Sequence, residues 1–130
     1  MTAPVDLVRR FLTLLETGQA DAAVDLLAPD VVWRNTGMPT FRGPKVAGML
    51  RDMERRGIGF RAEIHHIAGD GDVVLTDRTD YLSYRRWESG FWVCGTFEVR
   101  DGRLYLWDDH FSMGNVVAAS IRGLVGTVRG

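Results

Sequence analysis

The sequence is short of cysteine and of net charge, and each shortage excludes a class of protein. Cys94 is the only cysteine, so the chain has no intramolecular disulfide framework and lacks the thiolates of a cysteine-based zinc or iron–sulfur site. Sixteen basic and seventeen acidic residues leave a formal charge of -1, without the positive field of a nucleic-acid binder. We therefore expect no nucleic-acid partner, no cysteine-based metal site and a reducing compartment.

Long apolar runs are also missing. No stretch approaches the ~18 apolar residues that a membrane span requires. Near the start of the chain, Asp6, Arg9 and Arg10 interrupt the segment in which a secretory signal would have its apolar core. These features predict a cytoplasmic protein without a membrane partner.

What the chain does contain is the composition of one ordinary globular domain. Its 130 residues are 45% hydrophobic and 25% charged, which excludes disorder and low-complexity scaffolding. A chain of this length buries roughly two-thirds of its unfolded surface. We expect a single domain over residues 1–130.

The first half of the chain has the apolar spacing of helices. The pattern predicts an amphipathic helix over Pro4–Thr17 and a short second helix over Ala20–Leu27 that Pro29 ends. A strand is expected over Asp30–Asn35, followed by a third helix over Pro44–Arg55.

After Arg56 the pattern changes to extended segments separated by turns. These predict consecutive antiparallel strands at Ile58–Ile67, Val73–Tyr84, Phe91–Arg100 and Arg103–Phe111, with a longer loop between the second and third. A tail with glycines at Asn115–Val125 has a helical pattern. Helices followed by a meander of strands indicate an α+β domain, in which the early helices cover one face of a curved sheet.

Alternation along the strands groups polar residues by face. Arg78, Asp80 and Leu82 point the same way, and the first two have Cα atoms about 6–7 Å apart. The same alternation groups His66 with Phe60, which favours a histidine in the core or at a pocket rim. Alternation alone does not decide which face is inside.

The last strand places a carboxylate in an aromatic row. The row consists of Tyr105, Trp107, Asp109 and Phe111. Trp33 and Asn35 share a face of the first strand in the same way. A carboxylate among aromatic side chains is costly to bury, so Asp109 is a candidate functional group.

If the faces of Arg78, Asp80 and Asp109 converge, the three side chains have a definite electrostatic consequence. Two ionised carboxylates and one guanidinium would leave a net negative charge in an apolar pocket, so the trio should retain one proton. It then offers a general base and a general acid at the same pH. A structural salt-bridge network between strands is an equally open interpretation of the spacing.

At these residues the chain resembles the limonene-1,2-epoxide hydrolase family, a branch of the nuclear transport factor two-like and ketosteroid isomerase-like cone folds. The similarity extends across the chain, at Trp33–Asn35, Val74–Asp80, Phe91–Val99 and Leu106–Phe111. The resemblance implies helices packed on a strongly curved, mixed, mainly antiparallel sheet. This cone-shaped half-barrel would enclose an apolar pocket, and two copies would form a homodimer through the sheet.

The resemblance also implies a role for each residue. Asp109 would take a proton from a water molecule that Asn35 helps to hold, and Asp80 would protonate the epoxide oxygen. Arg78 would bridge the two aspartates. Water would attack carbon directly and yield a vicinal diol, with no covalent intermediate and no metal or organic cofactor. The substrate pocket would include Trp33, Trp107, Tyr105, Phe111 and Leu82.

One position departs from the family pattern. The family has a tyrosine two residues before the asparagine, and this chain has Trp33. An indole N–H donates a hydrogen bond but cannot accept one from water. Loss of one orienting contact of this kind lowers a rate by up to ~10²-fold.

Apolar surroundings with few polar groups indicate a lipophilic epoxide such as a terpene, fatty-acyl or sterol-like compound. Two other functions remain open at this stage. One is an isomerase or polyketide-cyclase-like enzyme on the same fold, and the presence of Trp33 in place of the family tyrosine is the feature that most favours it. The other is a non-catalytic domain that binds a small molecule.

Overall fold

The computed structural model describes residues 2–129, so the expected domain range of 1–130 extends one residue further at each end. Its helices are α1 (Pro4–Glu16), α2 (Ala20–Val24), α3 (Pro44–Arg55) and α4 (Met113–Arg129). Both α1 and α3 begin with proline, whose fixed φ suits the first turn of a helix. The first and third helices therefore lie where the sequence predicted them, and α4 is longer than expected.

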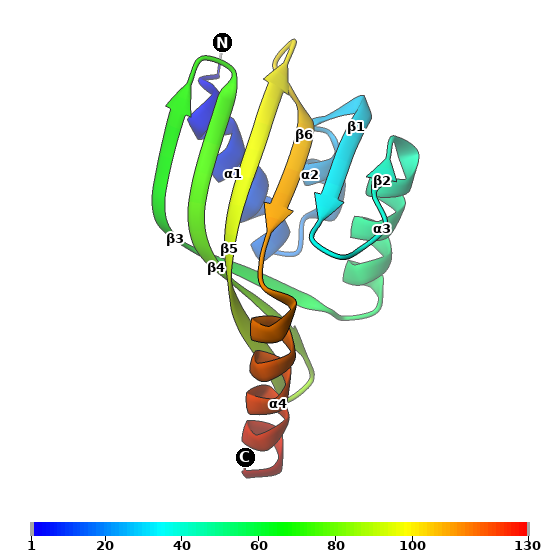
Figure 1. Cartoon of the computed structure of the whole chain (residues 1–130). Helices are drawn as coiled ribbons and strands as arrows, with labels where there is room; N and C mark the ends of the chain where they lie inside the picture. Colours follow the sequence, from blue (N-terminus) through cyan, green and yellow to red (C-terminus); the bar gives the residue numbers. More distant parts are fainter. Residues whose placement is uncertain (1, 130) are drawn as a thin grey trace.

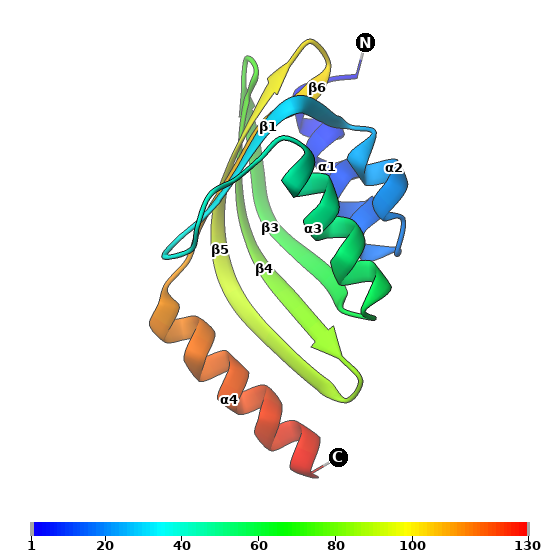
Figure 2. The same cartoon turned by 90° about the vertical axis from the view of Figure 1, so that its right-hand side faces the viewer.

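The strands form one curved sheet (Figures 1 and 2). They are β1 (Leu27–Asn35), β2 (Phe41–Arg42), β3 (Gly59–Asp70), β4 (Val73–Tyr84), β5 (Trp87–Arg100) and β6 (Arg103–His110), in the spatial order β2-β1-β6-β5-β4-β3. Every pairing is antiparallel except that of β1 with β6, which is parallel. The predicted α+β fold with a curved, mixed, mainly antiparallel sheet is confirmed.

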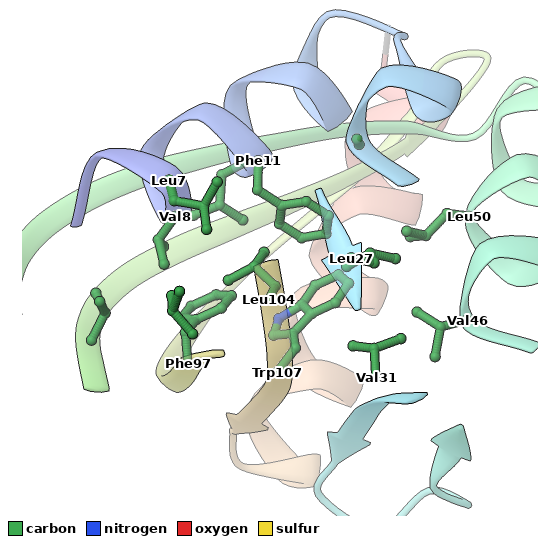
Figure 3. Close-up of a cluster of buried hydrophobic side chains, with 14 residues drawn as sticks. Leu7, Val8, Phe11, Leu27, Val31, Val46, Leu50, Phe97, Leu104 and Trp107 are labelled. Atoms are coloured by element: carbon green, nitrogen blue, oxygen red, sulfur yellow. The ribbon is translucent and has the colours of Figure 1, made fainter. Parts of the chain in front are cut away.

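Helices α1, α2 and α3 cover the concave face of the sheet, and the core lies between the two layers (Figures 2 and 3). Helix α1 contributes an apolar stripe in which Val8 and Phe11 have no exposed surface. Phe11 meets Trp107 of β6 edge-on, with ring centroids 5.1 Å apart. This contact anchors the last strand to the first helix.

The second helix ends earlier than predicted, and the first strand begins earlier than predicted. Helix α2 ends at Val24, and β1 begins at Leu27 and includes Pro29. The pairing of β1 with β6 is irregular between Leu27 and Val32. Proline lies in this irregular stretch, where a missing N–H breaks no regular ladder bond.

The expected long loop after Tyr84 is a tight hairpin instead. Tyr84 pairs with Trp87, and only Arg85 and Arg86 form the turn. Arg85 adopts a φ of 57°, the left-handed backbone that two-residue hairpin turns require. The polar, charged sequence looked like a loop because it lacks the glycine or asparagine usual at such a turn.

Two β-bulges reverse the alternation on which two of our expectations depended. One lies opposite Val99, so that Leu104 enters the core and Tyr105 turns outward to Arg100, whose guanidinium carbon is 3.6 Å from the ring centroid. The other precedes His66, which is exposed on the outer face rather than in the core or at the pocket rim.

Helix α4 supports the part of β5 that extends beyond β6. The ladder between β5 and β6 covers Cys94 to Arg100, so residues 87–93 of β5 have no strand on that side. Helix α4 packs along this segment, away from the three N-terminal helices (Figures 1 and 2). It thereby closes one side of the space under the curved sheet.

Candidate active site

The guanidinium of Arg78 is the centre of a buried polar cluster. Its side chain has 0% exposure and makes a two-point pair with Asp80, with Nε 2.8 Å from Oδ1 and Nη2 3.0 Å from Oδ2. Nη2 also donates to Oδ2 of Asp109 at 2.7 Å, and Nη1 donates to Oγ1 of Thr76 at 2.9 Å. The three side chains singled out in the sequence therefore meet on the concave face.

Asp109 comes to this cluster from β6 and is held by one of its two oxygens. Trp107 Nε1 donates to Oδ2 at 2.9 Å, the same oxygen that receives Arg78. Oδ1 is buried and has no hydrogen-bond partner among the described residues. Two donors thus fix the carboxyl group and leave one oxygen free to accept a proton.

Burial dominates the ionisation of both aspartates. Desolvation raises the pKa of Asp109 to about 6, although Arg78 opposes the shift. Desolvation likewise raises the pKa of Asp80, again against the opposing charge of Arg78. For Arg78 itself, burial alone would lower the pKa, but Asp109 and Asp80 together raise it, so the guanidinium stays charged. The cluster therefore favours retention of a carboxyl proton at unusually high pH.

Gly95 makes room for the cluster. It pairs with Asp109 across the β5–β6 ladder and with Thr76 across the β4–β5 ladder. A Cβ atom at this position would collide with Arg78 Nη1 and would lie 2.8 Å from both Asp109 Oδ1 and Thr76 Oγ1. No local pattern indicated this requirement, because a glycine within a strand is equally typical of a bulge or a bend.

A largely apolar cavity of about 380 Å³ adjoins the cluster. Asp109 and Asn35 are part of its wall, together with three residues expected in the pocket, namely Trp33, Trp107 and Phe111. Leu82, the fourth, also lines it. Tyr105 does not, because the bulge in the β5–β6 ladder turns it outward, so that expectation is wrong.

The two other members of the trio lie behind the lining residues. Arg78 is fully buried, and Asp80 keeps 8% of its side-chain surface exposed. Asp80 pairs across the ladder with Phe91 and is two residues from Leu82, both of which line the cavity. Asp109 therefore lines the cavity itself, and Asp80 lies beside residues that line it.

Parallel pairing of β1 with β6 brings the earlier strand to the site. Asn35 is level with Asp109, and Trp33 is level with Trp107. The two indoles are stacked, with centroids 4.2 Å apart and planes within 8°. Trp33 Nε1 is buried and has no hydrogen-bond partner in the described part of the chain.

Sequence reasoning missed the helical walls of the cavity. Helix α3 contributes Met49 and Met53, and α4 contributes Val116 and Ser120. It also missed Ser89 of β5, because this residue fell in the expected loop. Apolar spacing on α3 was the only signal that pointed to these walls.

Two negative findings apply to residues 2–129. They contain no group of three or more His, Cys, Asp or Glu side chains placed to hold a metal ion. They contain no helix long and apolar enough to cross a membrane.

Comparison with known proteins identifies the family. The model of the limonene-1,2-epoxide hydrolase catalytic domain matches residues 2–122. Epoxide hydrolase EphG of Mycobacterium tuberculosis is 42% identical over 122 residues, which cover 93% of this chain and 81% of EphG.

Solved structures agree with this result. The structure of an M. tuberculosis epoxide hydrolase of this type superimposes with a TM-score of 0.92 at 40% identity, covering 97% of this chain and 95% of the other. A candidate polyketide cyclase from Xanthomonas campestris pv. campestris reaches a TM-score of 0.74 at 20% identity, over 90% of this chain and 96% of that one. The second similarity shows a shared fold only. The chain belongs to the limonene-1,2-epoxide hydrolase family.

Proposed function

We propose that this epoxide hydrolase of the limonene-1,2-epoxide hydrolase type converts a lipophilic epoxide to a vicinal diol by direct attack of water. The observation that carries the proposal is Asp109 in the wall of an apolar cavity, with its Oδ1 unpaired among the described residues and with Arg78 and Asp80 behind it. A carboxylate base, a carboxylic acid and a guanidinium together are neutral, and they supply both proton transfers that ring opening needs.

Asp109 acts as the general base. Arg78 and Trp107 both donate to Oδ2 and stabilise the ionised carboxylate, so Oδ1 accepts a proton from the attacking water. Asn35 is level with Asp109 in the neighbouring strand and lines the same cavity, where its side-chain oxygen accepts a hydrogen bond from the second O–H of that water. The water oxygen is thereby oriented with a lone pair toward the substrate.

Asp80 acts as the general acid and carries the shared proton. As the water oxygen bonds to carbon, the epoxide C–O bond breaks and its electron pair takes the proton from Asp80. One turnover therefore moves a proton from Asp80 to Asp109, and the resting state returns when it is transferred back. The cluster loses one proton at Asp80 and gains one at Asp109, so its charge stays constant, and Arg78 pairs with both carboxyl groups.

Trp33 gives this chain a different water site from the family pattern. Its unpaired Nε1–H can donate to an oxygen in the cavity but cannot accept from water as a phenol does. The stack on Trp107 holds the indole in place. We therefore expect catalysis by this chain to be slower than with a tyrosine at position 33.

Residues 1–130 act as one domain in this proposal, without a metal or organic cofactor, in the cytoplasm and as a homodimer through the outer face of the sheet. Leu75 and Trp92, 55% and 51% exposed, lie on that face. An apolar row on α4, Val117, Ile121 and Leu124, is also exposed. A second copy would cover these side chains, and sedimentation of the wild type against Trp92→Glu measures that association.

The experiment that tests the function is single turnover of a panel of lipophilic epoxides in oxygen-18 water. Direct attack puts the solvent label in the diol of the first turnover, whereas a covalent ester would deliver an unlabelled oxygen from a carboxylate. Asp109→Asn should reduce diol formation by about 10²- to 10⁴-fold. Asp77→Asn, on the opposite face of the sheet, is the matched control.

If no epoxide yields a diol while both variants remain folded, the proposal fails. The isomerase, polyketide-cyclase-like and binding functions then become the leading candidates for the site. A variant that loses the fold together with the activity would instead assign the aspartates to a structural salt-bridge network.

A further inference from the structure

Ser89 has an unpaired hydroxyl in the wall of the active-site cavity. The residue is 2% exposed, and its Oγ has no hydrogen-bond partner among the described residues. It pairs with Leu82 across the β4–β5 ladder, and both residues line the cavity. Val116 and Ser120 of α4 line the same cavity, so this helix shields the serine end of β5 from solvent.

An unpaired buried polar atom is rare and usually has a functional reason. Three side-chain atoms of this kind occur among the described residues, namely Trp33 Nε1, Ser89 Oγ and Asp109 Oδ1, and all three residues line this cavity. The attacking water accounts for Asp109. The hydrolytic mechanism gives Ser89 no role, because the residue belongs to the arm of β5 beyond Asp109.

Ser120, which lines the same cavity, has a hydroxyl that makes a hydrogen bond. Its Oγ donates to the carbonyl of Val116 at 2.8 Å, which satisfies it within α4. The hydroxyl of Ser89 has no such contact, although it is the more deeply buried of the two serines. The donor of Ser89 is therefore unused, whereas the donor of Ser120 is already satisfied.

The strand register fixes the place of this hydroxyl relative to the acid. Asp80 pairs with Phe91, and Ser89 is two residues further along β5. A two-residue step in a strand is about 7 Å, so Ser89 lies about that far beyond the level of Asp80 on the same face. A substrate with its epoxide oxygen at Asp80 would place atoms five or six bonds away near the serine.

We infer that the substrate carries a second oxygen, a hydroxyl or carbonyl, that hydrogen-bonds to Ser89 Oγ. The inference rests on the proposed function and narrows its substrate class from any lipophilic epoxide to one with a hydroxyl or carbonyl at a defined distance from the ring. A serine hydroxyl donates to a carbonyl and can both donate to and accept from a hydroxyl. The apolar lining around it favours a neutral group over a carboxylate.

The test compares straight-chain epoxides that carry a hydroxyl at successive carbons with the parent hydrocarbon epoxide. Wild-type enzyme should prefer one hydroxylated isomer by about tenfold in kcat/KM, the usual gain from one satisfied buried hydrogen bond. Ser89→Ala should reduce that ratio to about one, and Ser89→Thr should restore it. Ser112→Ala, at an exposed serine that does not line the cavity, is the control and should keep the wild-type ratio.

Equal use of all isomers by the wild type, or a preference that survives Ser89→Ala, would overturn the inference. A second experiment tests the serine subsite independently of the proposed function. Calorimetry measures the binding of unreactive cyclic ethers with and without the hydroxyl. If no epoxide is hydrolysed, the proposed function fails. Hydroxyl-dependent ether binding that Ser89→Ala removes would still establish the subsite, and hydroxyl-independent binding would refute it.

Discussion

Strand β4 carries aspartates on both faces of the sheet, and they have opposite ionisation behaviour. Asp77 on the outer face accepts from Trp92 Nε1 at 2.6 Å and is 3.1 Å from His66 Nδ1, and these contacts lower its pKa. Asp80 on the concave face has a better partner, a two-point pair with Arg78, yet its pKa is raised. Partners alone therefore do not explain the difference.

Water explains it. The side chain of Asp77 is 38% exposed and that of Asp80 is 8% exposed, so only Asp80 bears the full cost of losing its hydration. Within three residues, the alternation of side chains along β4 separates a solvated carboxylate from one that can hold a proton. The concave face is thus the place where a carboxyl group can retain its proton, as the proposed general acid requires.

The largest expected effect comes from removing the buried cation. Arg78→Met leaves two buried carboxyl groups without a counter-charge and should cost about 3–5 kcal/mol of unfolding free energy at neutral pH. Diol formation should become undetectable. The loss of stability should shrink at acidic pH, where both carboxyl groups take up protons. Urea unfolding at several pH values measures this.

Arg51→Met is the control for that variant. Arg51 pairs with Asp21 at 2.8 Å, but both side chains are at least half exposed. The exposed pair should contribute less than about 1 kcal/mol. Equal losses in the two variants would show that burial does not set the strength of the Arg78 cluster.

A smaller effect is expected from filling the space beside the cluster. Gly95→Ala puts a methyl group against Arg78 and Asp109, which should displace the base and lower kcat/KM by about 10²-fold. Gly48→Ala on α3 meets nothing within 4 Å and should leave catalysis unchanged. Steady-state kinetics of both variants measure the effect. Wild-type rates for Gly95→Ala would mean that the cluster tolerates displacement.

The sequence predicted much of this site because strand alternation is local. Arg78 and Asp80 had to share a face, and Asp109 had to share one with Trp107. Tyr105 and His66 were misplaced because a bulge adds one residue without leaving a compositional trace. The family resemblance supplied the roles of the trio, which spacing alone left open.

Other features depend on contacts between distant segments. The parallel pairing of β1 with β6 brings Asn35 level with Asp109, 74 residues later in the chain. Ser89 became part of the cavity only because a tight turn at Arg85 extends the hairpin and α4 covers it. Neither the pairing of β1 with β6 nor the packing of α4 over β5 can be predicted from the spacing of residues within one segment.

The water site offers a still smaller change. Trp33→Tyr restores a group that can accept a hydrogen bond from water and should raise kcat/KM by about tenfold, and at most by ~10²-fold. Trp33→Phe removes the indole N–H without adding an acceptor, so it should give no gain. Kinetics on one epoxide with all three proteins are sufficient. If tyrosine and phenylalanine give the same rate, water positioning is not what Trp33 limits.

The smallest effect is expected from Asp77 on the outer face of the sheet. The pH dependence that it gives to the unfolding free energy has the opposite sign to that of Asp109 on the concave face. The folded-state pKa of Asp77 is lowered, so its stabilising contribution exists above the unfolded-state value and is lost as pH falls through the folded value. Asp109 has a raised folded-state pKa, so its contribution exists at low pH and is lost as pH rises toward about 6. In the wild type, the unfolding free energy should rise with pH where Asp77 ionises, and Asp77→Asn should abolish this rise. It should then fall as pH increases toward about 6, where Asp109 ionises, and Asp109→Asn should abolish this fall.

The catalytic pH profile completes this comparison. Because Asp109 must be ionised to act as a base, kcat/KM should fall as pH drops below about 6 in the wild type. Asp77→Asn should leave that limit in place, since the sheet separates Asp77 from the cavity. A limit that moved with Asp77 would mean that the charge of the outer face, together with His65 and His66 beside it, reaches the base through the sheet. The two faces would then titrate as one system, and burial alone would no longer explain why only the concave face holds a proton.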